Sequence, residues 1–142
     1  MKNIIYILLF ISSVGYSQTP ITDDNFRAAI EDCLSTHPIT GLCVDSEYGP
    51  MPDWDVSNVT DMEQAFQDKS DFNADISSWD ISNVENMKYI FYNASSFNQD
   101  IGGWDVSNVF SMFFMFSGAS SFNQNIGNWD VSNNRNCESM FS

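Results

Sequence analysis

Basic residues are scarce in this sequence, and their scarcity limits the partners that the protein can bind. Only 5 Lys and Arg oppose 19 Asp and Glu in the 142 residues, so the formal net charge is −14 at pH 7. A chain this acidic repels the phosphate backbone of nucleic acids and the headgroups of anionic lipids. We therefore expect no nucleic acid among its partners.

Histidine and cysteine are scarce as well. One His and three Cys leave few side chains for a zinc site or for a histidine-based catalytic centre. The cysteines form no Cys-x-x-Cys redox motif. The sequence therefore indicates no metal and no organic cofactor.

Long apolar runs are absent except at the N-terminus. Lys2 precedes an apolar run from Ile4 to Ile11, and Gly15 and Ser17 occupy the −3 and −1 positions of a cleavage site. This pattern predicts a secretory signal peptide over residues 1–17, because a membrane span needs about 20 apolar residues. We expect an exported protein, extracellular or on a bacterial cell surface, with no membrane span in the mature chain.

What the sequence has in abundance is a repeat of 25 residues. Each copy begins with Trp-Asp, followed by Val or Ile, then Ser-Asn, and no insertion breaks the period. A Met follows eight residues after the tryptophan and a Phe twelve residues after it. Such a period is typical of stacked coils, in which equivalent residues form ladders. The predicted core ladders are Trp54, Trp79, Trp104 and Trp129, Met62, Met87 and Met112, and Phe66, Phe91 and Phe116, with Asn side chains hydrogen-bonded between coils.

The pattern within one copy predicts both a strand and a helix. Val56 alternates with polar neighbours, as in a short strand. Met62, Ala65 and Phe66 have the i, i+3, i+4 spacing of one helical face. We therefore predict an α/β repeat solenoid similar to leucine-rich repeats, with short parallel strands and short helices in 25-residue coils. Three full repeats and a partial fourth would occupy residues 54–142.

Residues 18–53 do not repeat, and we expect them to form an N-terminal helical cap. Asp23 and Asp24 precede an apolar pattern that starts at Phe26, which predicts an N-capped amphipathic helix with acids in its first turn. Cys33 and Cys43 lie ten positions apart in a chain that we expect to be exported. They therefore predict a disulfide within the cap.

An aspartate follows every repeat tryptophan, and this row needs its own explanation. In stacked strands about 4.8 Å apart, like charges cost about 1 kcal/mol per pair in water. Turns in which each carboxylate accepts backbone N–H groups would relieve this cost, and we favour them over a calcium-binding solenoid. A carboxylate-based hydrolase is a further weak alternative, because a catalytic pair is a unique arrangement and these acids are copies. The row consists of Asp55, Asp80, Asp105 and Asp130.

The last copy departs from the others. Cys137 occupies the position of Met62, Met87 and Met112, which predicts a packed core thiol and not a nucleophile. The sequence stops at Ser142 within a coil, with no capping segment. We expect either a C-terminally truncated chain, which we favour, or end-to-end association through the uncapped C-terminal coil.

The repeat resembles that of the BspA-like leucine-rich-repeat surface proteins, which share it with a mycoplasma-type lipoprotein repeat family. The copy from Trp104 to Asn128 carries the resemblance most clearly, and the similar region covers residues 47–142. The resemblance implies a secreted or surface-exposed repeat protein linked to adhesion and protein binding. Members often end in a sorting domain that this sequence lacks, which fits a truncated member.

Aromatic residues of the second and third copies supply the candidate binding surface. They lie off the predicted core positions, where they form either an exposed apolar patch or a cover over neighbouring coils. We expect a non-enzymatic adhesion or protein-interaction module that binds an extracellular protein or glycan. The alternative is an architectural spacer of a larger surface protein. The patch residues are Tyr89, Tyr92, Phe110, Phe113 and Phe114.

Overall fold

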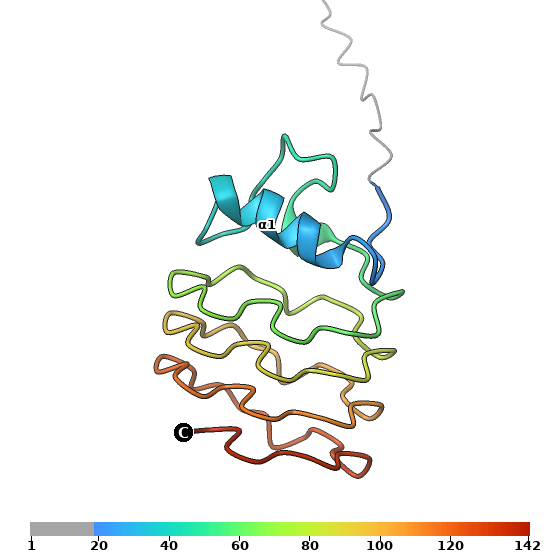
Figure 1. The fold of residues 1–142 in the computed structure, drawn as a ribbon, viewed down its shortest axis with the longest axis vertical. Coiled ribbons are helices and arrows are strands. Elements are labelled where there is room, and N and C mark those ends of the chain that lie inside the picture. The colour runs from blue at the N-terminus through green and yellow to red at the C-terminus, as the bar shows by residue number, and fades with distance from the viewer. Residues whose placement is uncertain (1–18) are drawn as a thin grey trace, which may run out of the picture.

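The computed structural model describes residues 19–142, so the predicted signal peptide over residues 1–17 lies outside the described residues. A cap over residues 19–53 contains helix α1 (Phe26–Thr36) and the short 3-10 helix η1 (Met51–Asp53). A coil stack follows, and its coils lie one beneath the other below α1 (Figure 1). We number them by the repeat as coil 1 (54–78), coil 2 (79–103), coil 3 (104–128) and coil 4 (129–142).

Helix α1 turns an apolar face into the molecule, but its predicted N-cap is wrong. Asn25 occupies the N-cap position without a side-chain capping bond, and the first turn contains no acid. The N–H of Phe26 donates to the backbone oxygen of Thr22 at 2.9 Å instead. The residues that α1 buries have the three- and four-residue spacing of one helical face: Phe26, Ala29, Ile30, Cys33 and Leu34.

Asp23, one of the two acids expected at the start of α1, instead attaches the N-terminal cap to coil 1. One carboxylate oxygen of Asp23 accepts the N–H groups of Thr60 and Asp61, at 2.8 and 3.1 Å. The other accepts the hydroxyl of Thr60 at 2.7 Å. Burial raises the pKa of Asp23, but these three hydrogen bonds outweigh it and hold the pKa below its ordinary value.

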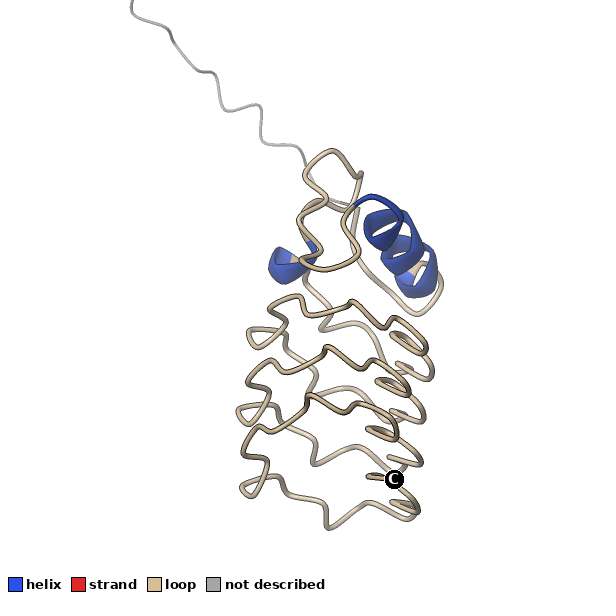
Figure 2. Ribbon diagram, turned by 90° about the vertical axis from the view of Figure 1, so that its left-hand side faces the viewer, coloured by secondary structure: helices blue, strands red, loops and turns tan. Residues whose placement is uncertain are grey.

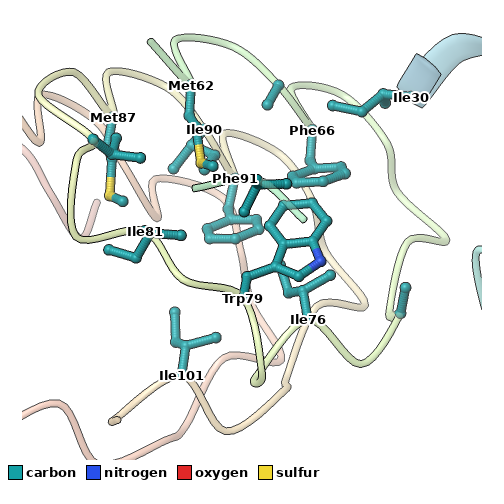
Figure 3. Packing of buried hydrophobic residues seen from close by; sticks show 14 of the residues in the cluster. Ile30, Met62, Phe66, Ile76, Trp79, Ile81, Met87, Ile90, Phe91 and Ile101 are labelled. Atoms are coloured by element: carbon teal, nitrogen blue, oxygen red, sulfur yellow. The ribbon is translucent and has the colours of Figure 1, made fainter. Parts of the chain in front are cut away.

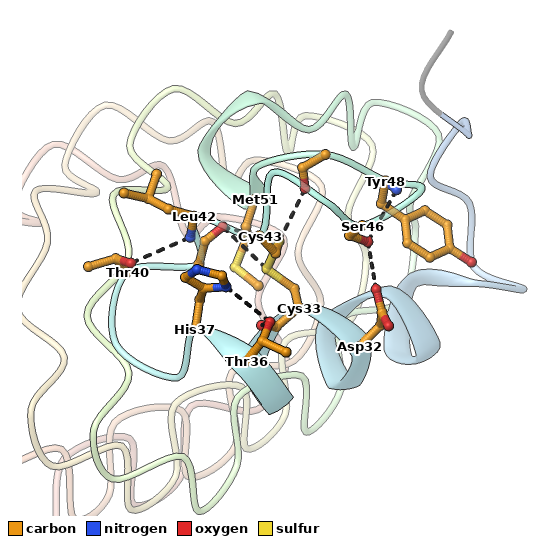
Figure 4. The surroundings of a disulfide bond; sticks show 12 residues. Asp32, Cys33, Thr36, His37, Thr40, Leu42, Cys43, Ser46, Tyr48 and Met51 are labelled. Carbon is orange, nitrogen blue, oxygen red and sulfur yellow. Dashed lines mark hydrogen bonds between the residues drawn. A yellow bond between two sulfur atoms is a disulfide. The ribbon is translucent and has the colours of Figure 1, made fainter. Parts of the chain in front are cut away.

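The predicted disulfide between Cys33 and Cys43 is confirmed, and Figure 4 shows its surroundings. Both cysteines are buried, and the bond joins α1 to the loop that follows it. Ser46 donates from its hydroxyl to Asp32 at 2.6 Å and ties the same loop to the helix a second time. Gly41 has φ of +62°, and a Cβ there would lie 2.9 Å from the Cβ of Met51, so only glycine fits the turn.

The predicted α/β repeat solenoid is wrong. Coils 1 to 4 consist of turns and irregular backbone, and the described residues contain no β-strand and no helix beyond the cap (Figure 2). Isolated parallel bridges replace the predicted strands. They join equivalent residues of successive coils: Asp61 with Asn86, Asn86 with Ser111, and Ser111 with Asn136.

Left-handed residues explain why no helix forms after Met62. Gln64 and Asp68 have φ of 60° and 59°, and a right-handed helix cannot continue through such residues. Alternate N–H groups therefore point along the stack. Gln64 donates to the oxygen of Lys88 at 2.8 Å, and Phe66 donates to that of Ile90 at 2.9 Å. The next coil thus satisfies the backbone groups that a helix would have satisfied internally.

A turn also replaces the predicted strand around Val56. Val59 donates its N–H to the oxygen of Val56 at 2.8 Å, which folds the chain back within three residues. Ser57 donates its N–H to the carboxylate of Asp55 at 3.0 Å. Both N–H groups are therefore used within the coil and are not available to a neighbouring strand.

Stacked rings fill the interior of the coil stack. The rings of Phe66, Phe91 and Phe116 lie 5.7 and 5.6 Å apart with nearly parallel planes. The centre of each ring lies about 4 Å from the centre of a ring in a second column, which consists of Phe72, Phe97 and Phe122. Figure 3 shows Phe66 and Phe91 with Trp79 beside them. Every residue of the predicted core ladders is buried.

Polar side chains bond the coils together outside this core. The amide of Asn83 donates to the oxygen of Ser57 at 2.9 Å, and Asn108 repeats the bond to Ser82 at 2.7 Å. Trp54 and Trp79 donate their indole N–H groups to backbone oxygens of the cap. Trp104 donates to Ile76 at the end of coil 1, and Trp129 donates to Ile101 at the end of coil 2, both at 3.2 Å. These asparagine bonds are the ones that the repeat predicts.

The prediction of a packed thiol at Cys137 is wrong. This cysteine is free and exposed, because no further coil of the described residues covers coil 4. For the same reason Val131 and Phe141 are 51% and 60% exposed, although they occupy core positions of the repeat. End-to-end association through this coil stays a prediction. No helix within residues 19–142 is long and apolar enough to cross a membrane.

Candidate interaction surface

The coils differ in character at three positions, which lie nine, ten and thirteen residues after the tryptophan. Coils 2 and 3 carry aromatic residues there, whereas coils 1 and 4 carry only polar or charged ones. The same backbone therefore accepts either kind of side chain, and packing of the repeat does not require the aromatic ones. Coil 1 has Glu63, Gln64 and Gln67, coil 2 has Lys88, Tyr89 and Tyr92, coil 3 has Phe113, Phe114 and Ser117, and coil 4 has Glu138, Ser139 and Ser142.

The structure brings four of the five predicted patch residues together. The ring of Tyr89 lies 5.6 Å from that of Tyr92, 5.4 Å from that of Phe113 and 5.6 Å from that of Phe114. Phe113 and Phe114 lie 4.5 Å apart. All four side chains are half-buried. We call these four residues the aromatic cluster.

Phe110 does not belong to the cluster. Its side chain is 40% exposed, and its ring contacts none of the cluster rings in the described structure. It lies six residues after Trp104, in a column between Glu85 and Arg135, to which its backbone is bonded. Sequence reasoning could not separate Phe110 from Phe113, because both lie off the predicted core positions of the repeat.

Two residues of the cluster stand in an unfavourable backbone conformation. Tyr89 and Phe114 have φ of 55° and 53°. A side chain in this region costs about 1–2 kcal/mol. A second left-handed position follows four residues later in each of these coils. Asn93 and Gly118 occupy it, and both residue types adopt a left-handed backbone at little cost. Gln64 and Ser139 have the same left-handed conformation at the equivalent positions of coils 1 and 4, so the conformation belongs to the repeat, and only the aromatic side chains set coils 2 and 3 apart.

The aspartate row is explained by turns. Asp55 accepts the hydroxyl and the N–H of Ser57 at 2.6 and 3.0 Å, and Asp80 accepts those of Ser82 at 2.7 and 3.1 Å. The serine hydroxyl, with the N–H, lowers the pKa of each aspartate. Within residues 19–142 no group of three or more His, Cys, Asp or Glu is placed to hold a metal ion.

Comparison with protein families gives one match. The model of a family described as "Mycoplasma protein of unknown function, DUF285" matches residues 43–142. The chain belongs to this family. No curated protein and no solved structure matches the chain. The resemblance to BspA-like proteins stays a prediction.

The DUF285 match spans the entire coil stack and the end of the cap, and the family description assigns no function. Function is therefore to be sought in the features that distinguish individual coils within the matched region. The aromatic cluster is the clearest such feature, since it is confined to coils 2 and 3.

Charged residues border the aromatic cluster, and sequence reasoning did not identify them. Asp68 donates its N–H to the oxygen of Tyr92 at 2.8 Å, and Phe114 donates its N–H to that of Glu138 at 3.1 Å. Both acids are exposed. Lys88 precedes Tyr89 and is half-buried. The 25-residue spacing could have located Lys88 and Glu138, because it places Glu63, Lys88, Phe113 and Glu138 in one column.

Proposed function

We propose that this protein is an exported or cell-surface interaction module without enzymatic activity, and that the aromatic cluster is its contact surface. The observation that carries the proposal is the gathering of four half-buried aromatic side chains where other coils have polar ones. Aromatic residues are enriched at the centres of protein interfaces and contribute much of their binding energy. The ligand would be an extracellular protein or glycan.

The use of the aspartates supports a role without catalysis. Asp55 and Asp80 are engaged in turns within their own coils, and Asp23 attaches the cap. These carboxylates serve the fold, and they are repeated or exposed and not paired in a cleft. A spacer role would need only the regular stack, so the cluster is what favours binding over a spacer.

The experiment compares the protein with its Phe113→Ser, Phe114→Ser double variant on a panel of immobilised extracellular-matrix proteins and glycans. We expect binding to a panel member to fall by about tenfold or more, as for loss of interface hot spots. The far-UV CD spectrum should stay unchanged, because coil 4 accommodates Ser139 at the position of Phe114.

Phe110→Ser is the matched control, since Phe110 is exposed but lies outside the cluster. It should leave binding unchanged. Equal binding by the double variant and the unmodified protein would contradict the proposal and favour the spacer role. Export is tested separately, by fusing residues 1–18 to a reporter and measuring its secretion.

A further inference from the structure

We propose that the aromatic cluster receives a cationic segment of a partner protein, with arginine or lysine side chains over its rings. This inference rests on the proposed function and names the chemistry of its ligand. Aromatic rings attract cations through their negative faces at distances up to about 6 Å, and Arg does so more often than Lys. The cluster supplies four such rings within one small area.

The charge of the whole molecule favours a cationic ligand. Acids outnumber bases by 19 to 5. Within residues 19–142 the pair of Lys69 and Glu31, 2.7 Å apart, is the one ion pair, so most carboxylates have no cationic partner. Unpaired charges of one sign create a field that attracts a ligand of the opposite sign and speeds its association. The same field opposes an anionic glycan.

The immediate border of the cluster adds to this field. Asp68 and Glu138 are bonded through the backbone to Tyr92 and Phe114, so an acidic residue adjoins the cluster on the side of coil 1 and another on the side of coil 4. The carboxylate of Asp68 accepts the amides of Asn93 and Gln67 and keeps its charge. A guanidinium over the rings would lie close to one of these acids. Cation–π attraction and charge pairing would then act on the same group.

Two bases lie near the cluster and oppose the ligand. Lys88 precedes Tyr89 in the chain, and its ammonium takes part in no ion pair within the described residues. Arg27 donates to the backbone oxygen of Glu63, which precedes Lys88 in the same column of the repeat. The carboxylate of Glu63 accepts the amide of Asn86 at 2.9 Å. Lys88 is therefore the residue whose replacement should most directly strengthen binding of a cation.

The ring planes also suit a side chain that reaches into the cluster from outside. The planes of Tyr89 and Phe113 meet at 87°, and those of Tyr89 and Tyr92 at 82°. Ring faces therefore point in more than one direction, so that two neighbouring cationic side chains of one segment could each meet a face. The half-buried state of the rings leaves part of each accessible.

The test measures binding of two fluorescein-labelled peptides to the full protein by fluorescence anisotropy. One peptide consists of Arg, Gly and Ser, and the other replaces each Arg by citrulline, which has a similar shape but no charge. We expect the arginine peptide to bind at least about tenfold more tightly than the citrulline peptide. Its affinity should fall as NaCl rises from about 50 to about 300 mM.

Variants separate the rings from the general charge. Phe113→Ser with Phe114→Ser keeps the net charge and should weaken the arginine peptide by about tenfold. Tyr89→Gln with Tyr92→Gln should act similarly, and it places the residues of coil 1, Gln64 and Gln67, in coil 2. Lys88→Glu should tighten binding by about threefold or more, and Phe110→Ser should leave it unchanged.

Each contrary result overturns this inference in a different way. Equal binding of the two peptides would mean that positive charge is not recognised, and equal binding by both ring variants would mean general acidic attraction only. Weaker binding by Lys88→Glu would contradict the charge argument. If these results occurred while the Phe113 and Phe114 variant still lost binding on the protein and glycan panel, the proposed function would stand and the cationic ligand would be rejected.

Discussion

The cap and the coil stack hold their chain in different ways. In the cap, backbone groups find partners within the cap itself, as Phe26 does with Thr22 and Thr19 does with Glu47, and Cys33 is bonded covalently to Cys43. In the stack, Gln64 bonds to Lys88, twenty-four residues along the chain. Order in the cap therefore comes from contacts within the cap, whereas order in a coil depends on the next coil.

The two regions meet through an ion pair, hydrogen bonds and a shared apolar core. Besides Asp23, Asn73 of coil 1 donates its N–H to the oxygen of Ile39 at 2.9 Å. The ring of Phe26 lies 5.9 Å from that of Trp79, which brings the first residue of α1 against coil 2. A substitution in one region should therefore show whether the stability of the other region changes with it.

The largest loss of stability is expected from a substitution in the core of the coil stack. Phe91→Ala removes a fully buried ring that lies between Phe66 and Phe116 and should lower the free energy of unfolding by about 3–5 kcal/mol. Urea unfolding followed by tryptophan fluorescence measures it. Phe110→Ala is the control and should change stability by less than about 0.5 kcal/mol. A similar loss in both variants would contradict the importance of contacts between coils.

The second largest loss of stability is expected from removal of the disulfide, and it should be confined to the cap. Replacing Cys33 and Cys43 by Ala opens a loop closed by residues ten apart and should cost about 2–4 kcal/mol. Hydrogen exchange should show faster exchange in α1, while amides of coils 2 and 3 such as Phe91 keep their protection. Equal loss of protection in coil 3 would show that the two regions unfold as one unit.

Asp23→Asn tests the junction and its pH dependence. The change should cost about 1 kcal/mol at pH 7, because the neutral amide oxygen accepts the two N–H groups less strongly and the amide nitrogen cannot accept the hydroxyl of Thr60. The pKa of Asp23 is lower in the folded state, so its contribution is present above its ordinary value of 3.8 and is lost as the pH falls through the folded value. The difference between variant and wild type should therefore shrink in acid.

Urea midpoints measured from pH 7 down to pH 3 check this expectation. Asp24→Asn is the matched control, since Asp24 is the exposed neighbour. It should change stability little at any pH. A difference between wild type and Asp23→Asn that grows in acid would contradict the assigned hydrogen bonds.

The smallest expected effect is a gain in stability within coil 3. The hydroxyl of Ser111 is buried without a hydrogen-bond partner. At the same position, Asn86 accepts the N–H of Lys88 at 3.2 Å, and Asn136 accepts that of Glu138 at 3.2 Å. Ser111→Asn should restore this bond and raise stability by up to about 1 kcal/mol.

Thermal unfolding measures this gain, and Ser120→Asn on the exposed surface serves as the control. A loss of stability in Ser111→Asn would show that the site lacks room for the larger side chain, since Ser111 is only 2% exposed.

Part of the fold could be predicted from the sequence because identical residues at one spacing have identical neighbours. The burial of Trp79 and the asparagine bond from Asn83 to Ser57 follow from this. The helix expected after Met62 could not be corrected in this way, because Gln64 and Asp68 carry no local signal of left-handed backbone as glycine would. The candidate surface was found from its aromatic composition, but not its limits, which exclude Phe110.

The sequence by itself determined the 25-residue period, the residues that occupy core positions and the two cysteines that pair in the cap. Only the tertiary structure decided the form of the backbone within a coil. The cost of a left-handed residue such as Gln64 is offset by an N–H bond to the next coil, and no local pattern shows that bond. The same holds for the aromatic cluster, whose rings come from two coils and meet because the coils stack.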